Sequence, residues 1–182
     1  ASDVYKRQGK TYAMLEAAHM AKQQGIDVVA GYIEPHARPK TAALLNGLEV
    51  LPTREVLYNG MILNEFDIDM ALKRKPQLIL VDELAHTNAE GCRHAKRYQD
   101  IKELLNAGID VYTTVNVQHI ESLCDTVSSI TEIVVQERIP DSLFDNADQV
   151  ELIDIEPQDL IDRLNTGNAV SYTHLTLPTI CS

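Results

Sequence analysis

The sequence predicts an α/β protein in which a mostly parallel sheet carries helices on both faces. Segments with apolar residues at helical spacing alternate along the chain with short segments rich in Val and Ile, which is typical of parallel sheets built from strand–helix units. Residues 78–81 (Leu-Ile-Leu-Val) form an uninterrupted aliphatic run, as expected of a strand covered on both faces. The 182 residues, 45% of them apolar, suffice for one domain with its own core.

Local patterns define the individual elements. Several predicted helices end at a glycine or before a proline, because glycine tolerates the left-handed conformation of a helix end and proline cannot continue a helix. Asn59-Gly60 between two apolar segments predicts a hairpin, because this dipeptide suits a tight turn with positive φ at both central residues. In chain order we predict a helix over residues 10–24, a strand over 26–33, a short helix over 40–46, hairpin strands over 55–58 and 61–63, a helix over 67–75, a strand over 78–81, a loop over 84–96, a helix over 97–107, a strand over 110–115, a helix over 119–127, a strand over 133–135, a short helix over 141–146, a strand over 150–155 and a helix over 158–165.

The chain is strongly acidic, with 27 Asp and Glu against 16 Lys and Arg and a formal charge of −11. Phosphate backbones and anionic membrane surfaces repel such a chain, which argues against nucleic acid as its partner. No apolar run approaches the roughly 18–20 residues needed to cross a bilayer, so we expect no membrane insertion by this chain. The lack of a signal-like start and of closely paired cysteines favours a cytoplasmic location.

The two ends of the chain differ from its middle. Residues 170–182 contain no Asp, Glu, Lys or Arg, and residues 1–8 fit neither a strand nor a helix start. An abrupt change in composition marks a change of origin or a disordered tail. We therefore predict one domain over residues 9–169, with a foreign segment at 1–8 and a foreign or disordered tail at 170–182.

The first candidate site is Gly9-Lys10-Thr11, which opens the first predicted helix. A helix N-terminus presents N–H groups and a partial positive charge to phosphate oxygens; a lysine adds a mobile charge, and a threonine hydroxyl can bind Mg²⁺. The full phosphate-loop (Walker A) pattern requires a glycine at the position of Val4 and a preceding strand, and both are missing. The alternative is that this tripeptide is an ordinary surface segment.

The second candidate site is the pair Asp82 and Glu83, which follows the aliphatic run 78–81 directly. At a strand end Asp82 can hold Mg²⁺, and Glu83 can polarise a water molecule for attack on a γ-phosphate. Together with Lys10, this acidic strand end (Walker B) predicts a P-loop NTPase-like fold whose first strand and loop start are missing. The alternative is that Asp82 merely caps the next segment.

The loop over residues 84–96 follows the acidic pair and leads into the next helix. Arg93, Lys96 and Arg97 form a basic cluster there, which would neutralise phosphate charge or contact an acidic face of a partner. The alternative is a solvated helix start with ion pairs. No common zinc spacing is matched by the nearby metal-binding residue types, which are His86, Cys92, His94 and His119.

Two further strand ends carry polar residues. Residues 34–38 (Glu-Pro-His-Ala-Arg) follow the strand over 26–33, where a side chain can reach a ligand or form a structural turn. Thr114 and Asn116 end a later strand; either could sense a γ-phosphate, or both could cap the helix that follows.

Several of these segments together carry a family resemblance. They resemble the N-terminal cytoplasmic domain of KdpD-type sensor histidine kinases, which regulate bacterial high-affinity potassium uptake. The resemblance covers about residues 9–169. The segments that carry it are 9–15 (GKTYAML), 27–34 (DVVAGYIE), 47–52 (GLEVLP), 80–88 (LVDELAHTN), 97–100 (RYQD) and 116–122 (NVQHIES).

The resemblance implies a membrane-anchored parent protein that responds to potassium limitation and osmotic stress. It implies that this domain binds ATP with Mg²⁺, tunes the balance of kinase and phosphatase activity, and contacts other domains of the parent, while the kinase core lies outside this chain. By motif position, Lys10 and Thr11 carry over as the phosphate and Mg²⁺ residues, and Asp82 carries over as the acidic-strand aspartate.

These observations lead to one set of expected site residues. We expect Glu83 to be the catalytic residue and Thr11 and Asp82 to bind Mg²⁺. Because residues 1–8 stand where the family has earlier glycines and a strand, we expect weak or absent ATP affinity. Two alternatives stay open: a free-standing P-loop kinase or NTPase, and a protein-interaction module that binds no nucleotide. The expected nucleotide-binding residues are Gly9, Lys10, Thr11, Asp82, Arg93 and Asn116.

Overall fold

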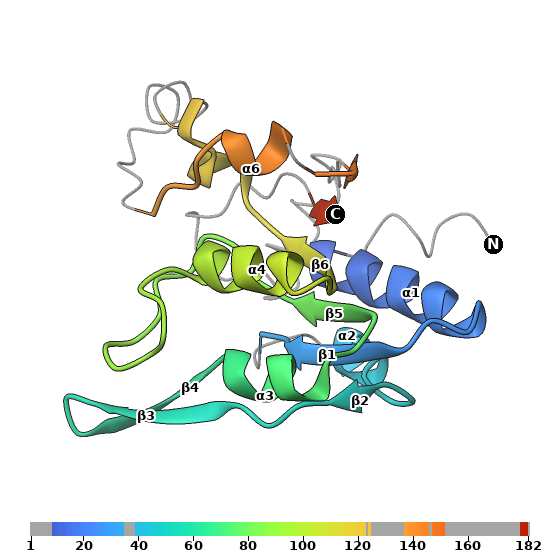
Figure 1. Cartoon of the computed structure of the whole chain (residues 1–182), viewed down its shortest axis with the longest axis horizontal. Coiled ribbons are helices and arrows are strands. Elements are labelled where there is room, and N and C mark those ends of the chain that lie inside the picture. The colour runs from blue at the N-terminus through green and yellow to red at the C-terminus, as the bar shows by residue number, and fades with distance from the viewer. Residues whose placement is uncertain are drawn as a thin grey trace, which may run out of the picture.

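A computed structural model describes residues 9–34, 39–122, 124, 137–145, 147–151 and 179–181. Its elements are shown in Figure 1. In chain order they are α1 (Lys10–Gln23), β1 (Val28–Tyr32), α2 (Pro39–Ala43), β2 (Glu49–Val50), β3 (Arg54–Tyr58), β4 (Met61–Glu65), α3 (Ile68–Arg74), β5 (Leu78–Val81), α4 (Arg97–Asn106), β6 (Asp110–Thr114), a short 3₁₀-helix (Val117–His119), α6 (Ser142–Asp145), β7 (Gln149–Glu151) and β8 (Thr179–Cys181).

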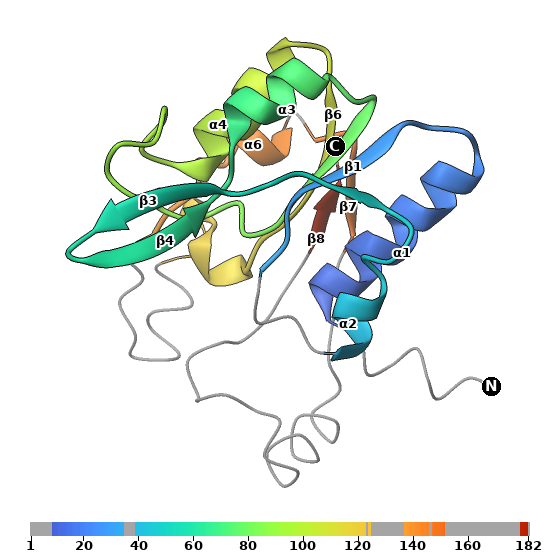
Figure 2. The ribbon, with the colours of Figure 1, turned by 90° about the horizontal axis from the view of Figure 1, so that it is seen from below.

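The described strands form one six-stranded sheet and a separate hairpin (Figures 1 and 2). The sheet has the order β2-β1-β5-β6-β8-β7. Its first four strands pair in parallel, whereas β8 pairs antiparallel with both β6 and β7. The predicted α/β fold with a mostly parallel sheet is therefore confirmed.

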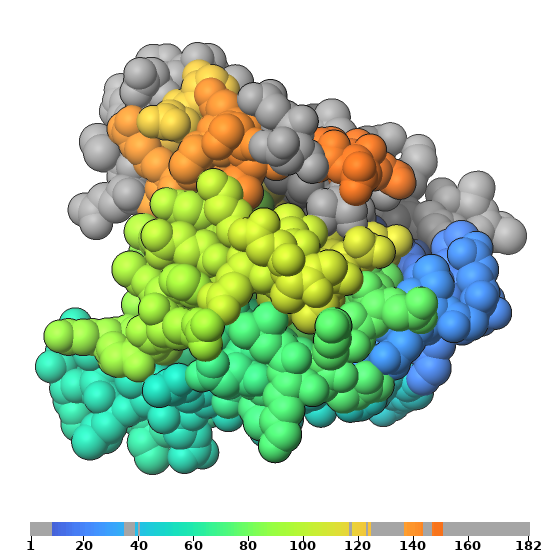
Figure 3. Space-filling view, in the orientation of Figure 1, coloured from blue at the N-terminus to red at the C-terminus, as the bar shows by residue number. Residues whose placement is uncertain are grey.

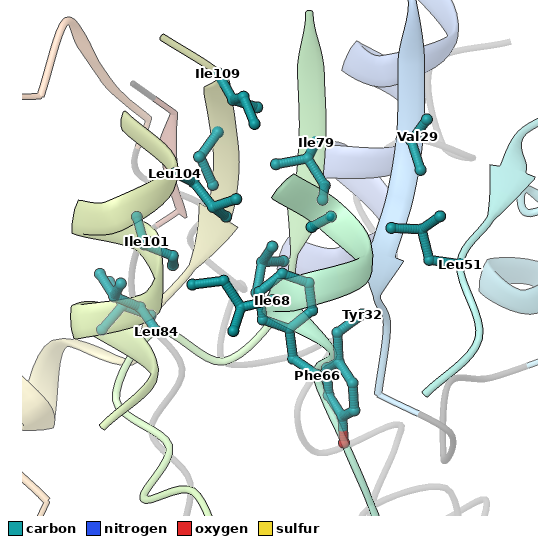
Figure 4. Packing of buried hydrophobic residues seen from close by; sticks show 14 of the residues in the cluster. Val29, Tyr32, Leu51, Phe66, Ile68, Ile79, Leu84, Ile101, Leu104 and Ile109 are labelled. Atoms are coloured by element: carbon teal, nitrogen blue, oxygen red, sulfur yellow. The ribbon is translucent and has the colours of Figure 1, made fainter. Parts of the chain in front are cut away.

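The two faces of the sheet carry separate apolar cores. Successive residues of a strand point to opposite faces, so Val29 and Ile79 pack with residues of α3 and α4, while Leu78 and Leu80 pack with residues of α1. Figure 4 shows the first of these cores. Burying a large aliphatic side chain contributes about 1.5–3 kcal/mol, so both helical layers are held mainly by β1 and β5.

The hairpin has the turn that its sequence predicts. Asn59 and Gly60 have φ values of 50° and 80°, and positive φ at both central residues gives a turn whose twist matches that of the strands. At the base of the hairpin, Glu65 is buried with 4% of its surface exposed. The other end projects away from the body of the protein (Figures 1 and 2).

Most predicted elements within the described residues are confirmed. β5 coincides with the predicted strand, and α1, β1, α3, α4 and β6 agree with theirs to within a few residues. β2 and β8 were not among the predicted strands: β2 has only two residues, both exposed, and β8 falls in the end segment 170–182. No helix among the described residues has the length and apolarity to cross a membrane.

Some predictions fall where the structure gives no description. The predicted strand over 133–135, the helix over 158–165, and residues 123 and 125–127 of the helix over 119–127 lie outside the described residues. Residues 1–8 and most of residues 170–182 also lie outside them. The foreign origin of the two end segments stays a prediction.

Candidate functional site

A cavity of about 380 Å³ lies where α1 begins and where β5 and β6 end. Parallel strands bring their carboxyl ends to one edge of the sheet, which is where open α/β sheets bind ligands. The volume lies within the range of small-molecule sites. The residues that line the cavity are Lys10, Thr11, Glu34, Asp82, Glu83, Ala85, His86, Thr114, Val115, Asn116, His119 and Glu137.

The start of α1 supplies a cation and a hydroxyl to this cavity. Gly9 is the N-cap residue and makes no side-chain cap, so no capping side chain competes with a ligand for the first N–H groups of the helix. The Thr11 hydroxyl donates to Asp82 Oδ2 at 2.9 Å. Lys10 Nζ donates to Asn116 Oδ1 at 2.5 Å. The structure thus brings the predicted residues of three distant segments together.

Lys10 supplies the fixed positive charge of the cavity. It is the only Lys or Arg among the described residues that line it. Burial lowers the pKa of Lys10 to about 8, although the charges of Asp82 and Glu83 act in the opposite direction. The ammonium group is therefore still mostly protonated at pH 7.

Partners on several elements orient Asp82 at the end of β5. The residue is 2% exposed. Its Oδ1 accepts hydrogen bonds from the Thr114 hydroxyl and from the Glu83 N–H, the latter at 3.2 Å, and its own N–H donates to the Tyr32 carbonyl at 2.9 Å. Because the carboxylate is already oriented, its Oδ2 and the Thr11 hydroxyl form a pair of oxygens that suits a hard cation.

Glu83 combines an uncommon backbone conformation with a perturbed carboxyl group. Its φ is 61°, in the left-handed region that residues with side chains seldom adopt. Its side chain lines the cavity and is 45% exposed. Burial, followed by the charges of Glu34 and Asp82, raises the pKa of Glu83 to about 7, while Arg97 and His86 oppose the shift. Both features are common at functional sites.

Arg97 lies in the protein interior. The predictions that it contacts a phosphate or belongs to a solvated surface cluster are therefore wrong. It is 0% exposed. Nη2 donates to Glu65 Oε2 at 3.0 Å, and Nη1 donates to the main-chain carbonyl of Asp82 at 3.2 Å. The guanidinium carbon lies 4.1 Å from the ring centroid of Tyr32. Arg97 is buried because its charge neutralises the buried Glu65 carboxylate behind the cavity.

The other two members of the basic cluster also have partners elsewhere. Arg93 donates to Asp69 at 2.7 Å and to Glu103 at 2.5 Å, and it is not among the described residues that line the cavity. Lys96 Nζ donates to the Thr87 hydroxyl at 2.5 Å. The structure therefore does not bring Arg93 together with the other predicted nucleotide-binding residues, because acidic side chains of α3 and α4 hold its guanidinium.

Glu65 and His86 complete a polar network that the sequence analysis missed. His86 Nε2 donates to the Glu65 carboxylate at 3.1 Å, and its Nδ1 lies 3.9 Å from Glu83 Oε2. Although burial acts to raise it, the pKa of Glu65 is held below its usual value by hydrogen bonds from His86 and the Ala89 N–H and by the charge of Arg97. Glu65 is therefore a buried carboxylate anion.

The fold and the cavity define an α/β protein with a carboxylate-rich cavity at the carboxyl end of a parallel sheet. The chain belongs to the family of osmosensitive K⁺ channel His kinase sensor domains (KdpD), whose family model matches residues 4–177. The family resemblance of the sequence motifs is thereby confirmed.

Three relatives show the extent of the similarity. The chain is 62% identical over 159 residues to the sensor protein KdpD of Clostridium acetobutylicum and 58% identical over 159 residues to that of Escherichia coli K12; each match covers 87% of this chain and 18% of the relative. It is 52% identical over 159 residues to a putative sensor protein KdpD of Synechocystis, with 87% and 43% covered. The chain thus spans about a fifth of the length of the first two relatives.

The Arg97–Glu65 pair predicts a large loss of stability when one partner is removed. Arg97→Met leaves the Glu65 anion buried without its cation, so the free energy of unfolding should fall by about 3–5 kcal/mol. Urea unfolding followed by circular dichroism measures this loss. Adding Glu65→Gln should restore part of it, because the uncompensated charge is then removed.

Arg93→Met is the matched control, since Arg93 also bonds two carboxylates but is 45% exposed. Its loss should be much smaller, because exposed ion pairs contribute little. Equal losses for the two arginine variants would contradict the role of Arg97.

Proposed function

We propose that this domain binds ATP with Mg²⁺ in the cavity and acts as a regulatory domain of a sensor histidine kinase. The kinase controls high-affinity potassium uptake under potassium limitation and osmotic stress. One observation carries the proposal: Lys10 and Thr11 at the start of α1 meet Asp82 at the end of β5 in a single cavity. The names of the family and of the relatives, sensor domain and sensor protein, support the signalling part.

The phosphate side of the cavity fits a polyphosphate. The first turn of α1 contains no acidic residue, so no side chain there neutralises the positive end of the helix dipole. Among the described residues, no atom lies within 4 Å of a Cβ built on Gly9, so none of them fills the space beside the helix start. Lys10 adds its ammonium group to these N–H donors, and this combination is suited to phosphate oxygens.

The metal side fits Mg²⁺ in particular. Mg²⁺ in nucleotide sites takes one or two protein oxygens and fills its remaining positions with water and phosphate. Asp82 Oδ2 and the Thr11 hydroxyl, 2.9 Å apart, would provide those two oxygens. In the described part of the chain no group of three or more His, Cys, Asp or Glu is arranged to hold a metal, which agrees with a metal that arrives with the nucleotide.

The acidic lining makes ATP binding dependent on Mg²⁺. Glu34, Asp82, Glu83 and Glu137 surround a single lysine, so a metal-free triphosphate would be repelled. Replacing Mg²⁺ with EDTA should weaken ATP binding at least about 10-fold, measured by calorimetric titration. In Asp82→Asn the gain from Mg²⁺ should shrink. Equal ATP affinity with and without Mg²⁺ would contradict this assignment.

Lys10 tests the phosphate side independently. Lys10→Ala removes a charge-assisted hydrogen bond worth about 1.5–3 kcal/mol, so Mg²⁺–ATP affinity should fall by about 10- to 100-fold in the same titration. Lys22→Ala is the matched control, because Lys22 is exposed in the last turn of the same helix. If both variants bind Mg²⁺–ATP like the wild type, the proposed site is wrong.

Hydrolysis of ATP is a second candidate function, favoured by the position and pKa of Glu83. Its carboxyl group lines the same cavity as Asp82, and a pKa of about 7 suits a general base at neutral pH. Glu83→Gln should then reduce the rate of phosphate release at least about 100-fold while leaving Mg²⁺–ATP affinity within a few-fold. Glu55→Gln, on exposed β3, is the control. A wild-type chain that binds ATP without releasing phosphate would leave binding as the only function.

A further inference from the structure

The outer end of the β3–β4 hairpin exposes four large apolar side chains. We call them the hairpin tip: Leu57 is 74% exposed, Tyr58 43%, Met61 61% and Ile62 64%. The tip lies at one corner of the molecule, away from the sheet and its helices (Figure 3). Its apolar area is on the order of a few hundred Å², comparable to the largest patches of monomeric proteins, which often mark interaction sites.

Both faces of the hairpin tip are apolar. Leu57 pairs with Ile62 across the hairpin, and Tyr58 pairs with Met61. Cross-strand partners share a face, and successive pairs alternate between faces. Each face therefore carries one exposed apolar pair, so neither face of the tip is a polar, solvent-facing surface.

The hairpin also lacks the features that usually protect an open strand edge. Within the described residues it forms a two-stranded sheet that no third strand extends. Lysine, proline and bulges normally keep such edges from pairing with other strands. Residues 54–65 contain neither Lys nor Pro, and the five pairs of the ladder run without a register shift. The edges are therefore suited to pairing with another strand.

Repulsion between two copies of this acidic chain is weak at the hairpin tip. The chain carries −11, so two copies repel each other over most of their surfaces. Residues 56–63 contain no Asp, Glu, Lys or Arg, and the hairpin carries this uncharged segment away from the body. Identical copies thus meet with little repulsion at the tip.

We propose that the hairpin tip is a self-association surface, on which a second copy of this chain docks through its own tip. A two-fold axis beside the hairpin would join two edges into a four-stranded sheet and bring both sets of apolar pairs together. Because edge-to-edge pairing leaves part of each face exposed, two tips would bury on the order of several hundred Å² in total, below the size of standard specific interfaces. The dimer is accordingly weak and reversible, and it needs no nucleotide.

Sedimentation velocity of the 182-residue chain without nucleotide tests this proposal, from low micromolar to several hundred micromolar protein. The sedimentation coefficient should rise with concentration, and more so at high NaCl, because salt screens the repulsion between acidic copies. Ile62→Glu should raise the dimer dissociation constant at least about 10-fold. Met20→Glu is the matched control, since Met20 is 62% exposed on α1, and it should leave the dimer intact.

A second variant keeps the test decisive if Ile62→Glu does not fold. The chain has no tryptophan, so Tyr58→Trp places a single reporter in the tip, whose emission should shift to shorter wavelength as dimer forms. A chain that stays monomeric at all concentrations and salts overturns the proposal, as does equal loss of dimer in Ile62→Glu and Met20→Glu. A monomer that binds phosphatidylcholine vesicles through Ile62 would also overturn it, in favour of a lipid surface.

Discussion

The buried guanidinium of Arg97 is the constraint on which the geometry of the site depends. A charge without exposed surface must find compensating partners inside the protein. Here these are the Glu65 carboxylate, the carbonyl of Asp82 and the ring of Tyr32. These residues lie at or beside the ends of β4, β5 and β1, so satisfying one side chain from α4 fixes three strand ends. The turn at Asp82 and Glu83, and with it the acidic side of the cavity, follows from that fit.

The positions of Lys10, Thr11, Asp82 and Asn116 at the cavity were predictable because two general rules place them. Parallel strands end at one edge of a sheet, so polar residues that follow these strands, such as Asp82 and Asn116, both line the cavity although they are 34 positions apart in the chain. A helix start that carries Lys10 and Thr11 reaches the same edge, and the Lys10–Asn116 hydrogen bond spans 106 positions. Local signals also suffice for β5, which is buried on both faces, and for the Asn-Gly turn.

The residues behind the cavity were not predictable, because burial of a charge depends on partners that only the folded chain brings together. Arg97 follows Arg93 and Lys96 in sequence, and nothing local distinguishes the buried guanidinium from these two more accessible side chains. For Glu65 the one local signal is the alternation of side chains along a strand, which puts it on the same face of β4 as Leu63. The hairpin, however, is exposed over most of its length. The partners of Arg93 on α3 and α4 are likewise tertiary.

The same buried pair joins the cavity to the hairpin. Glu65 is the last residue of β4, so the base of the hairpin is held by the guanidinium that also holds the carbonyl of Asp82. His86 adds a second connection, because it lines the cavity and bonds the same carboxylate. Loss of Arg97 would leave the buried Glu65 carboxylate without its cation, which is costly, whereas loss of His86 would still leave Glu65 bonded to Arg97 and to the Ala89 N–H. The base of the hairpin is therefore held in a fixed orientation relative to the cavity, and a hairpin with a fixed base requires less ordering on association than a free loop would.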